Sequence, residues 1–433
     1  MPEIAMQLAL IAIAALSVLF LLGRSYSLLI WTIVAAGWSQ SSLLSITHSL
    51  DAQYVDDIPT IALIVGAIFY AVQSGDRRNF KALGLVLVLV AVVGFGFIRS
   101  PDAGIGLAQA RQVLLPLGLM FAGFALRDAI RWRSVQKTII FFGFLTILWI
   151  GCEEVLQRPL LDPVWYYIEG INAKSLSLRE GLPPAYFADG IGGETIFRPG
   201  GPYMNAPVMG FILGLSAYAA VARLRGVTRI VYLAATVAAL YVSYARAGLL
   251  IFAVVTIIYF IWLKVGRLAG VFVAAGLGVF MIVTFLDQGN TASHSEGLQT
   301  GFLTGLTSPL GLGFGTTGYQ AALEIGSMGV GAESLLGLYF AWLGWPMIAA
   351  AAVFGIAMFR RLRGLARHRS LEVWAAVAFM LAVASSESAS SIASTPMFWV
   401  LCGTVLGTSF ESGTGRLALR REPRISLSPG VGV

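Results

Sequence analysis

Residues 82–98 read ALGLVLVLVAVVGFGFI, an apolar run without a single charged or hydrogen-bonding side chain. A helix of this length nearly crosses the hydrocarbon core of a bilayer, which is roughly 30 Å thick. Comparable runs recur along the whole chain, in which 57% of the 433 residues are hydrophobic and only 12% are charged. Barrel strands alternate in polarity and these runs do not, so the sequence predicts an all-α, polytopic transmembrane helical bundle.

The apolar runs predict about 12–13 membrane spans. They lie at 4–22, 27–46, 58–73, 82–98, 112–126, 138–155, 204–222, 228–243, 247–263, 268–286, 333–357, 372–386 and 396–410. The chain then divides into N-terminal helices (1–155), a long loop (156–203), central helices (204–286), a second long loop (287–332), C-terminal helices (333–410) and a polar tail (411–433). Because no basic region precedes 4–22, we expect a retained span there rather than a cleaved signal.

The charges separate into two sets when the connections between spans are assigned to alternate sides. One side collects 22 of the 29 basic residues and five acids, and the other side collects 7 basic and 17 acidic residues. By the positive-inside rule the basic side is cytoplasmic. The net charge of +7 therefore reflects membrane topology and does not indicate nucleic-acid binding.

Two connections on the opposite, outer side stand apart from the short cytoplasmic ones. The stretches 156–203 and 287–332 are long and rich in glycine, proline and polar residues. Loops of this length in a compact protein are usually functional or disordered, and Trp165, Tyr166 and Tyr167 favour an ordered loop. We therefore expect the functional site on the outer face. Three basic residues of the first loop, Arg158, Lys174 and Arg179, are expected to be solvated charges that pair with nearby acids such as Asp162.

Two other outer arginines are better candidates for a site. Arg198 opens RPGGPYMNAPVMG (198–210), which also contains Tyr203 and Asn205 and leads into a predicted span. The free amides at a helix start attract anions, and a guanidinium binds phosphate through two hydrogen bonds. Arg246 stands in SYARAGLL (243–250), a tight link between spans, where an arginine normally faces a partner or a polar cavity. Together they suggest one bound anionic group such as a diphosphate.

The remaining candidates flank this region. Arg99 and Arg111 lie on either side of a short loop that contains Asp102, and both are possible anion-binding residues. The segment GLGFGTTG (311–318) has the spacing G-x-G-x-x-G, but it follows a predicted transmembrane helix and no βαβ unit surrounds it. A tight turn beside the site is expected instead of nucleotide binding.

Two titratable groups bracket that glycine turn. His294 stands in SHSEGL (293–298), and Glu333 opens GAESLLGLYFAWLGW (331–345). Either could act as a general base, Glu333 if partial burial raises its pKa at the membrane surface. Each also has a simpler interpretation: Glu333 as a first-turn acid favoured by the helix dipole, and His294 as a loop histidine.

Taken in order, the segments RPGGPYMNAPVMG, SYARAGLL, SHSEGL with SPLGLGFGTTG, and AESLLGLYFAWLGW resemble the O-antigen ligase and Wzy-type polymerase family. The resemblance covers residues 195–357. It implies a GT-C-type glycosyltransferase in the bacterial inner membrane with its active site facing the periplasm. Such enzymes transfer oligosaccharide from undecaprenyl diphosphate to a hydroxyl of a glycan acceptor, without a metal or another cofactor. They can work with a chain-length regulator.

The chain also departs from the family pattern. Ligases typically carry a histidine near the start of the late span, where this sequence has Glu333. An arginine usual before the glycine turn is replaced by the region of His294 and Glu296. These differences favour a polymerase of O-antigen or exopolysaccharide units. In that reading Arg198 and Arg246 hold the diphosphate, Glu333 or His294 deprotonates the acceptor, and the displacement inverts the anomeric carbon.

Other functions stay open at this stage. Within the transferases, a ligase acting on lipid A-core and a protein-glycosylating oligosaccharyltransferase are the alternatives. The other class is a transporter or flippase of an anionic or lipid-linked solute. Transporters place ionisable residues near the bilayer midplane and often contain a repeated half. Here the polar residues lie at the outer boundary and no repeat is evident, which favours the enzyme.

Overall fold

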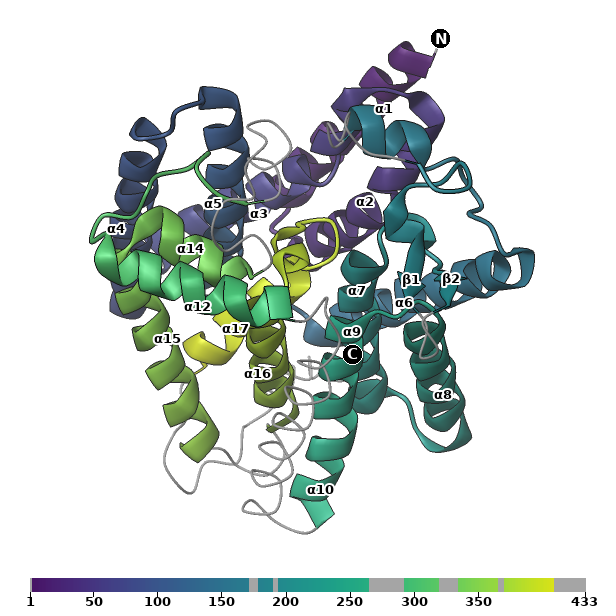
Figure 1. Cartoon of the computed structure of the whole chain (residues 1–433). Coiled ribbons are helices and arrows are strands. Elements are labelled where there is room, and N and C mark those ends of the chain that lie inside the picture. Colours follow the sequence, from purple (N-terminus) through teal and green to yellow (C-terminus); the bar gives the residue numbers. More distant parts are fainter. Residues whose placement is uncertain are drawn as a thin grey trace, which may run out of the picture.

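The computed structural model describes residues 2–170, 178–189, 194–264, 292–318, 334–364 and 370–408. Within these ranges the chain is almost entirely helical, as Figure 1 shows. The helices of the first half are α1 (Pro2–Leu22), α2 (Tyr26–Thr47), α3 (Asp57–Ser74), α4 (Arg77–Ile98), α5 (Ala103–Ala125), α6 (Trp132–Leu156) and α7 (Ala206–Arg223). Those that follow are α8 (Gly226–Val242), α9 (Arg246–Ala253), α10 (Tyr259–Lys264), α12 (Ala292–Thr307), α14 (Leu335–Leu343), α15 (Trp345–Gly364), α16 (Ser370–Ser385) and α17 (Pro396–Gly407).

Among the described residues, six helical segments are long and apolar enough to cross a membrane. They are α2, residues 50–74 (the turn η1, Leu50–Tyr54, and α3), α4, α5, α6 and α7. Several shorter helices are also apolar, among them α8, α16, α17 and residues 345–360 of α15. The predicted all-α helical bundle is thus confirmed in class, and the chain has the character of a multi-pass membrane protein.

The described helices match the predicted spans with two clear exceptions. α5 begins at Ala103, nine residues before the predicted start at 112, so Arg111 lies within a helix and not at the end of a loop. The predicted span 333–357 is divided into α14 and α15 at Gly344, whose φ of 63° and ψ of −141° suit glycine alone. A side chain at Gly344 would also collide with the carbonyl oxygens of Ser308 and Pro309. The break exists because a turn from elsewhere in the chain packs against the helix here, which sequence periodicity cannot reveal. The predicted span 268–286 lies outside the described residues.

Two helices approach each other closely where a glycine of one helix faces the backbone of the other. Gly123 of α5 lies against the carbonyl of Val400 in α17, and Gly403 lies against the carbonyl of Met120. Thr404 adds a hydrogen bond from its hydroxyl to the carbonyl of Gly123, at 3.2 Å. Small residues at such crossings favour helix association in lipid, where apolar burial gives no driving force. By contrast, α4 leaves most of its apolar surface exposed, as expected of a helix that faces lipid.

The two long predicted loops, 156–203 and 287–332, contain ordered structure. In the first, β1 (Phe187–Asp189) pairs antiparallel with β2 (Thr195–Phe197), and short helical turns lie at η2 (Tyr166–Gly170), η3 (Pro184–Tyr186) and η4 (Gly201–Tyr203). The ring of Trp165 stacks on His48 after the end of α2, with centroids 5.0 Å apart. In the second, the expected loop 287–332 contains α12, which packs on α14 with Gly301 against Gly337.

Candidate functional site

Arg198 directly follows the β hairpin of the loop 156–203. Its backbone amide donates to the carbonyl of Tyr186, at 2.8 Å. Its guanidinium donates through Nε to the carbonyl of Ser243 (2.8 Å) and through Nη2 to that of Tyr244 (3.2 Å). These two residues begin the link between α8 and α9, so Arg198 joins the loop 156–203 to the segment that leads into α9. Nη1 takes no part in these two bonds.

Arg246 is the first residue of α9 and lies two residues beyond the carbonyl that Arg198 holds. The link bends sharply at Tyr244, whose φ is 50°, and the amide of Arg246 donates to the Tyr244 carbonyl at 3.0 Å. The structure therefore places the two candidate arginines beside one another at one helix start.

The electrostatics of Arg198 reflect this proximity. Burial lowers the pKa of the Arg198 guanidinium to about 10, Tyr167 opposes the shift, and the positive charge of Arg246 adds to it. At neutral pH Arg198 therefore remains charged. An anion bound between Arg198 and Arg246 would offset the repulsion between their two positive charges.

A buried carboxylate anchors the loop that carries Arg198. Glu153, near the end of α6, is 1% exposed. Its Oε2 accepts from the amide of Gly201 at 2.9 Å, and its Oε1 accepts from the amide of Leu160 (3.2 Å) and from Nε1 of Trp149 (3.0 Å). One acid thus ties two separate loop segments to the same helix end. In the sequence, Glu153 is visible only as an acidic residue within a predicted span, and no sequence pattern identifies its hydrogen-bond partners.

The two other predicted ligands in the RPGGPYMN segment, Asn205 and Tyr203, have different surroundings. Asn205 caps α7, because its side-chain oxygen accepts from the amide of Val208 at 3.3 Å. Tyr203 is fully buried, and burial together with the nearby Asp56 carboxylate raises the pKa of its hydroxyl. Its hydroxyl therefore lies near a carboxylate, an environment that does not suit a diphosphate ligand. Tyr167 donates from its hydroxyl to the Met204 carbonyl at 2.8 Å, which ties the loop together.

Arg99 and Arg111 are directed to different neighbours. Arg99 donates from Nη1 to the Leu310 carbonyl, at 2.9 Å, beside the glycine turn. Arg111 pairs with Asp57, the first residue of α3, with 2.6 Å between Nη2 and Oδ1. Asp102 pairs with neither, because it caps α5 by accepting from the amide of Ile105 at 2.9 Å. The proximity of the two arginines in sequence does not make them a joint anion site in the described structure.

The glycine turn 311–318 is held by the protein itself. Gly311, Gly313, Gly315 and Gly318 all have positive φ, which explains their number. The amides of Leu312, Gly313 and Phe314 donate to carbonyls of α14 and α4, and Gln109 accepts from Gly315 and donates to Thr317. With these amides occupied, the turn cannot cradle a phosphate through them. It connects α4, α5 and α14.

The expected general bases are not placed. Glu333 lies outside the described residues, and His294 belongs to α12 without a described side chain.

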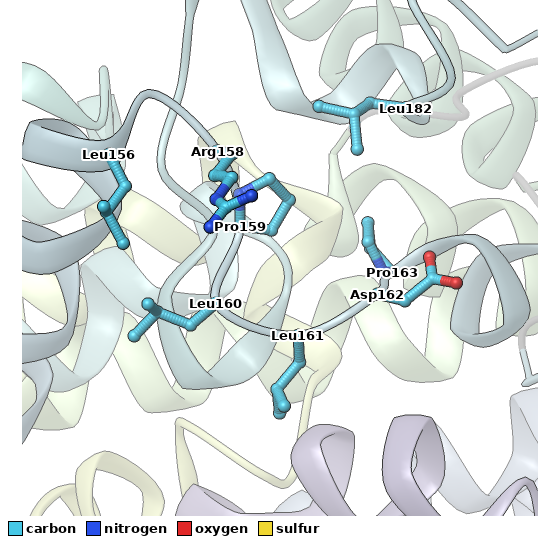
Figure 2. A pocket seen from close by; sticks show the side chains of 8 residues that line it. All are labelled: Leu156, Arg158, Pro159, Leu160, Leu161, Asp162, Pro163 and Leu182. Atoms are coloured by element: carbon cyan, nitrogen blue, oxygen red, sulfur yellow. The ribbon is translucent and has the colours of Figure 1, made fainter.

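Among the expected solvated loop charges, Arg158 and Arg179 form no ion pair with a described acid, and Arg179 lies over the ring of Phe187. Lys174 lies outside the described residues. Figure 2 shows a pocket beside the end of α6, lined by Leu156, Arg158, Pro159, Leu160, Leu161, Asp162, Pro163 and Leu182. Its leucines and prolines make it mainly apolar. It neighbours the segment that Glu153 anchors, but it does not contain the arginine pair.

No known protein family matches the sequence, and no characterised protein or solved structure is similar enough to count as a match. What the chain does must therefore be argued from its own side chains.

We predict that Glu153→Ala loosens both loop segments that meet at the end of α6. Three donors would lose their acceptor in a buried place, which lowers the free energy of unfolding by about 1–3 kcal/mol. Hydrogen–deuterium exchange should become faster at the amides of Gly201 and Leu160, and thermal unfolding in detergent should begin at a lower temperature. Glu153→Gln keeps one acceptor oxygen, so its stability should lie between that of the unmodified protein and that of Glu153→Ala.

The neighbouring acid of the same helix, Glu154, provides the control. Glu154→Ala should leave both exchange rates near those of the unmodified protein. Equal effects of Glu154→Ala and Glu153→Ala would contradict the anchoring role.

Proposed function

We propose that this chain is an inner-membrane glycosyltransferase that polymerises undecaprenyl-diphosphate-linked oligosaccharide units during O-antigen or exopolysaccharide synthesis. The observation that carries the proposal is the pair Arg198 and Arg246, brought together at the start of α9 from separate outer segments. Two guanidinium groups at one place suit a diphosphate, which carries two adjacent anionic groups. The order of sequence motifs that resembles the ligase and polymerase family supports the same reaction.

In the proposed reaction, a hydroxyl oxygen of the acceptor glycan attacks the anomeric carbon of the donor sugar. The new glycosidic bond forms as the bond between that carbon and the diphosphate oxygen breaks. The hydroxyl proton passes to Glu333, or alternatively to His294. Undecaprenyl diphosphate leaves with its negative charge stabilised by Arg198 and Arg246.

The test is incubation of the purified protein in detergent with lipid-linked oligosaccharide from its host. A ladder of products indicates a polymerase. A single transfer to lipid A-core indicates a ligase, and the absence of any product contradicts both and favours a transporter or flippase. Detergent removes the compartments that transport requires, so product formation cannot arise from transport.

The proposal includes about 12–13 spans, with the loops 156–203 and 287–332 in the periplasm. We predict that a cysteine at Glu180 reacts with a membrane-impermeant maleimide from the periplasmic side and that a cysteine at Arg133 does not. Cys152 is exposed and is first replaced by serine, whereas Cys402 is buried and can stay. Labelling of Arg133→Cys from the periplasm would overturn this orientation.

We predict that Arg198→Ala and Arg246→Ala each lower transfer by about 100- to 1,000-fold, as is usual when a donor to a developing anion is lost. Lysine should restore little, because a point charge cannot form two parallel bonds. In the double variant the combined loss should fall well short of additive, since both residues hold one group.

The control for this pair is Arg158→Ala, which removes an exposed arginine of the same outer loop. Binding of the lipid-linked donor is measured for every variant. Unchanged donor affinity in both arginine variants, or fully additive losses, would show that the arginines do not share the diphosphate.

For the base, we predict that Glu333→Gln lowers turnover by roughly 10²–10⁴ while the donor still binds, because the amide cannot take a proton. If His294 is the base instead, His294→Ala shows that loss. The rate of the unmodified enzyme then decreases as the pH is lowered through about 6–7, because the histidine becomes protonated. Turnover of both variants over a pH range separates the two. Near-normal turnover of Glu333→Gln ends its candidacy.

A further inference from the structure

A second group of buried polar side chains lies where α2, α3 and α5 meet the turn η4. We call it the Asp56 cluster: Gln40, Asp56, Thr60, Arg111 and Tyr203. Gln40 donates from Nε2 to Oδ1 of Asp56, at 2.6 Å. Arg111 is held by its ion pair with Asp57, next to Asp56. Asp56 and Tyr203 are 1% exposed and Thr60 is fully buried.

The cluster is assembled from segments far apart in the sequence. Thr60 is one helical turn beyond Asp56, to whose carbonyl its amide donates at 3.3 Å. Tyr203 arrives with η4, which is fixed to α2 by the Ser42 hydroxyl donating to the Pro202 carbonyl at 3.3 Å. The influence of the Asp56 carboxylate on the pKa of Tyr203 agrees with this proximity.

Four polar atoms of the cluster are buried and have no hydrogen-bond partner among the described residues: Asp56 Oδ2, Thr60 Oγ1, Arg111 Nε and Tyr203 Oη. Buried polar atoms in native proteins are nearly always paired, so such a concentration at one place calls for water or a ligand. The side chain of Arg111 is 37% exposed, and the cluster therefore has an edge that faces outward.

The chemistry of these atoms selects the kind of ligand. Asp56 Oδ2 accepts, Arg111 Nε donates, and the hydroxyls of Thr60 and Tyr203 can do either. A phosphate needs donors only, and a hard metal cation needs oxygen acceptors only. Neighbouring hydroxyls of a sugar each donate and accept, which matches the mixed set.

We propose that the Asp56 cluster binds hydroxyl groups of the acceptor glycan; this inference rests on the proposed transferase function and adds its second substrate. The cluster lies within reach of the arginine pair, since Tyr203 is five positions after Arg198 and extended chain spans at most about 18 Å over that distance. A donor diphosphate at Arg198 and an acceptor at Tyr203 can thus be held by one segment. Tyr203 then serves the acceptor and not the diphosphate.

The decisive variants are Tyr203→Phe and Thr60→Val. Each removes a hydroxyl that has no hydrogen-bond partner among the described residues, so thermal stability should stay equal or rise. If the hydroxyls bind the acceptor, its KM should rise by roughly two- to tenfold in each variant, with kcat and donor affinity little changed. Asp56→Asn keeps the shape and the bond from Gln40, and should raise the acceptor KM by roughly ten- to a hundredfold, because bonds to charged groups are stronger.

Trp132→Phe is the matched control. It also removes a buried donor without a described partner. Trp132 is the first residue of α6 and lies about 30 Å, by helix rise, from Glu153, which binds Gly201 of η4 at the opposite end of the helix. Its acceptor KM should equal that of the unmodified protein. An unchanged KM in both Tyr203→Phe and Thr60→Val would overturn the proposal and leave internal water as the partner of the cluster.

A binding measurement separates this proposal from the proposed function. The probe is lipid-free oligosaccharide released by mild acid from the lipid-linked intermediates of the host, titrated into the full chain in detergent. If the unmodified protein makes no product but binds the probe, and Tyr203→Phe binds it more weakly, the transferase proposal fails and the glycan site stands. If the unmodified protein does not bind the probe, the glycan site is overturned.

Discussion

Peptide groups without hydrogen-bond partners are very costly in a bilayer, where no water can replace the missing partner. The long helices of this chain follow from that constraint, and so do the exceptions. Where the backbone leaves helical geometry, side chains replace the missing bonds. Glu153 accepts from two loop amides, Arg198 donates to two carbonyls before α9, and Gln109 holds the glycine turn at Gly315 and Thr317.

In the proposed transferase, the same polar anchors hold the segments that would bind the two substrates. Arg198 is held at the start of α9 beside Arg246, and the bond from the Gly201 amide to Glu153 holds the segment that follows Arg198. The same segment continues to Tyr203, beside Asp56. One short stretch of chain therefore connects an arginine pair suited to an anion with a cluster of mixed donors and acceptors suited to hydroxyls. A transferase needs two such places, one for each substrate.

The glycine turn illustrates how a motif can have a purely structural origin. Its spacing imitates a nucleotide fingerprint, yet its glycines supply positive φ and permit close contact with α14 and Arg99. The amides that a phosphate would require already donate to carbonyls of neighbouring helices. Gly344 completes this arrangement, because the break between α14 and α15 leaves room for the turn at Pro309.

Composition and hydropathy alone determined the all-α membrane bundle, because a chain in lipid must satisfy its backbone within each apolar segment. The sequence also singled out Arg198 and Arg246, since arginines on the outer side go against the charge bias. Which side faces the periplasm, and which residue is the base, remain predictions. Only the tertiary structure paired Arg111 with Asp57, gave Glu153 its partners and assembled the Asp56 cluster. These contacts join residues far apart in the chain, and they depend on how the helices pack, which no local pattern encodes.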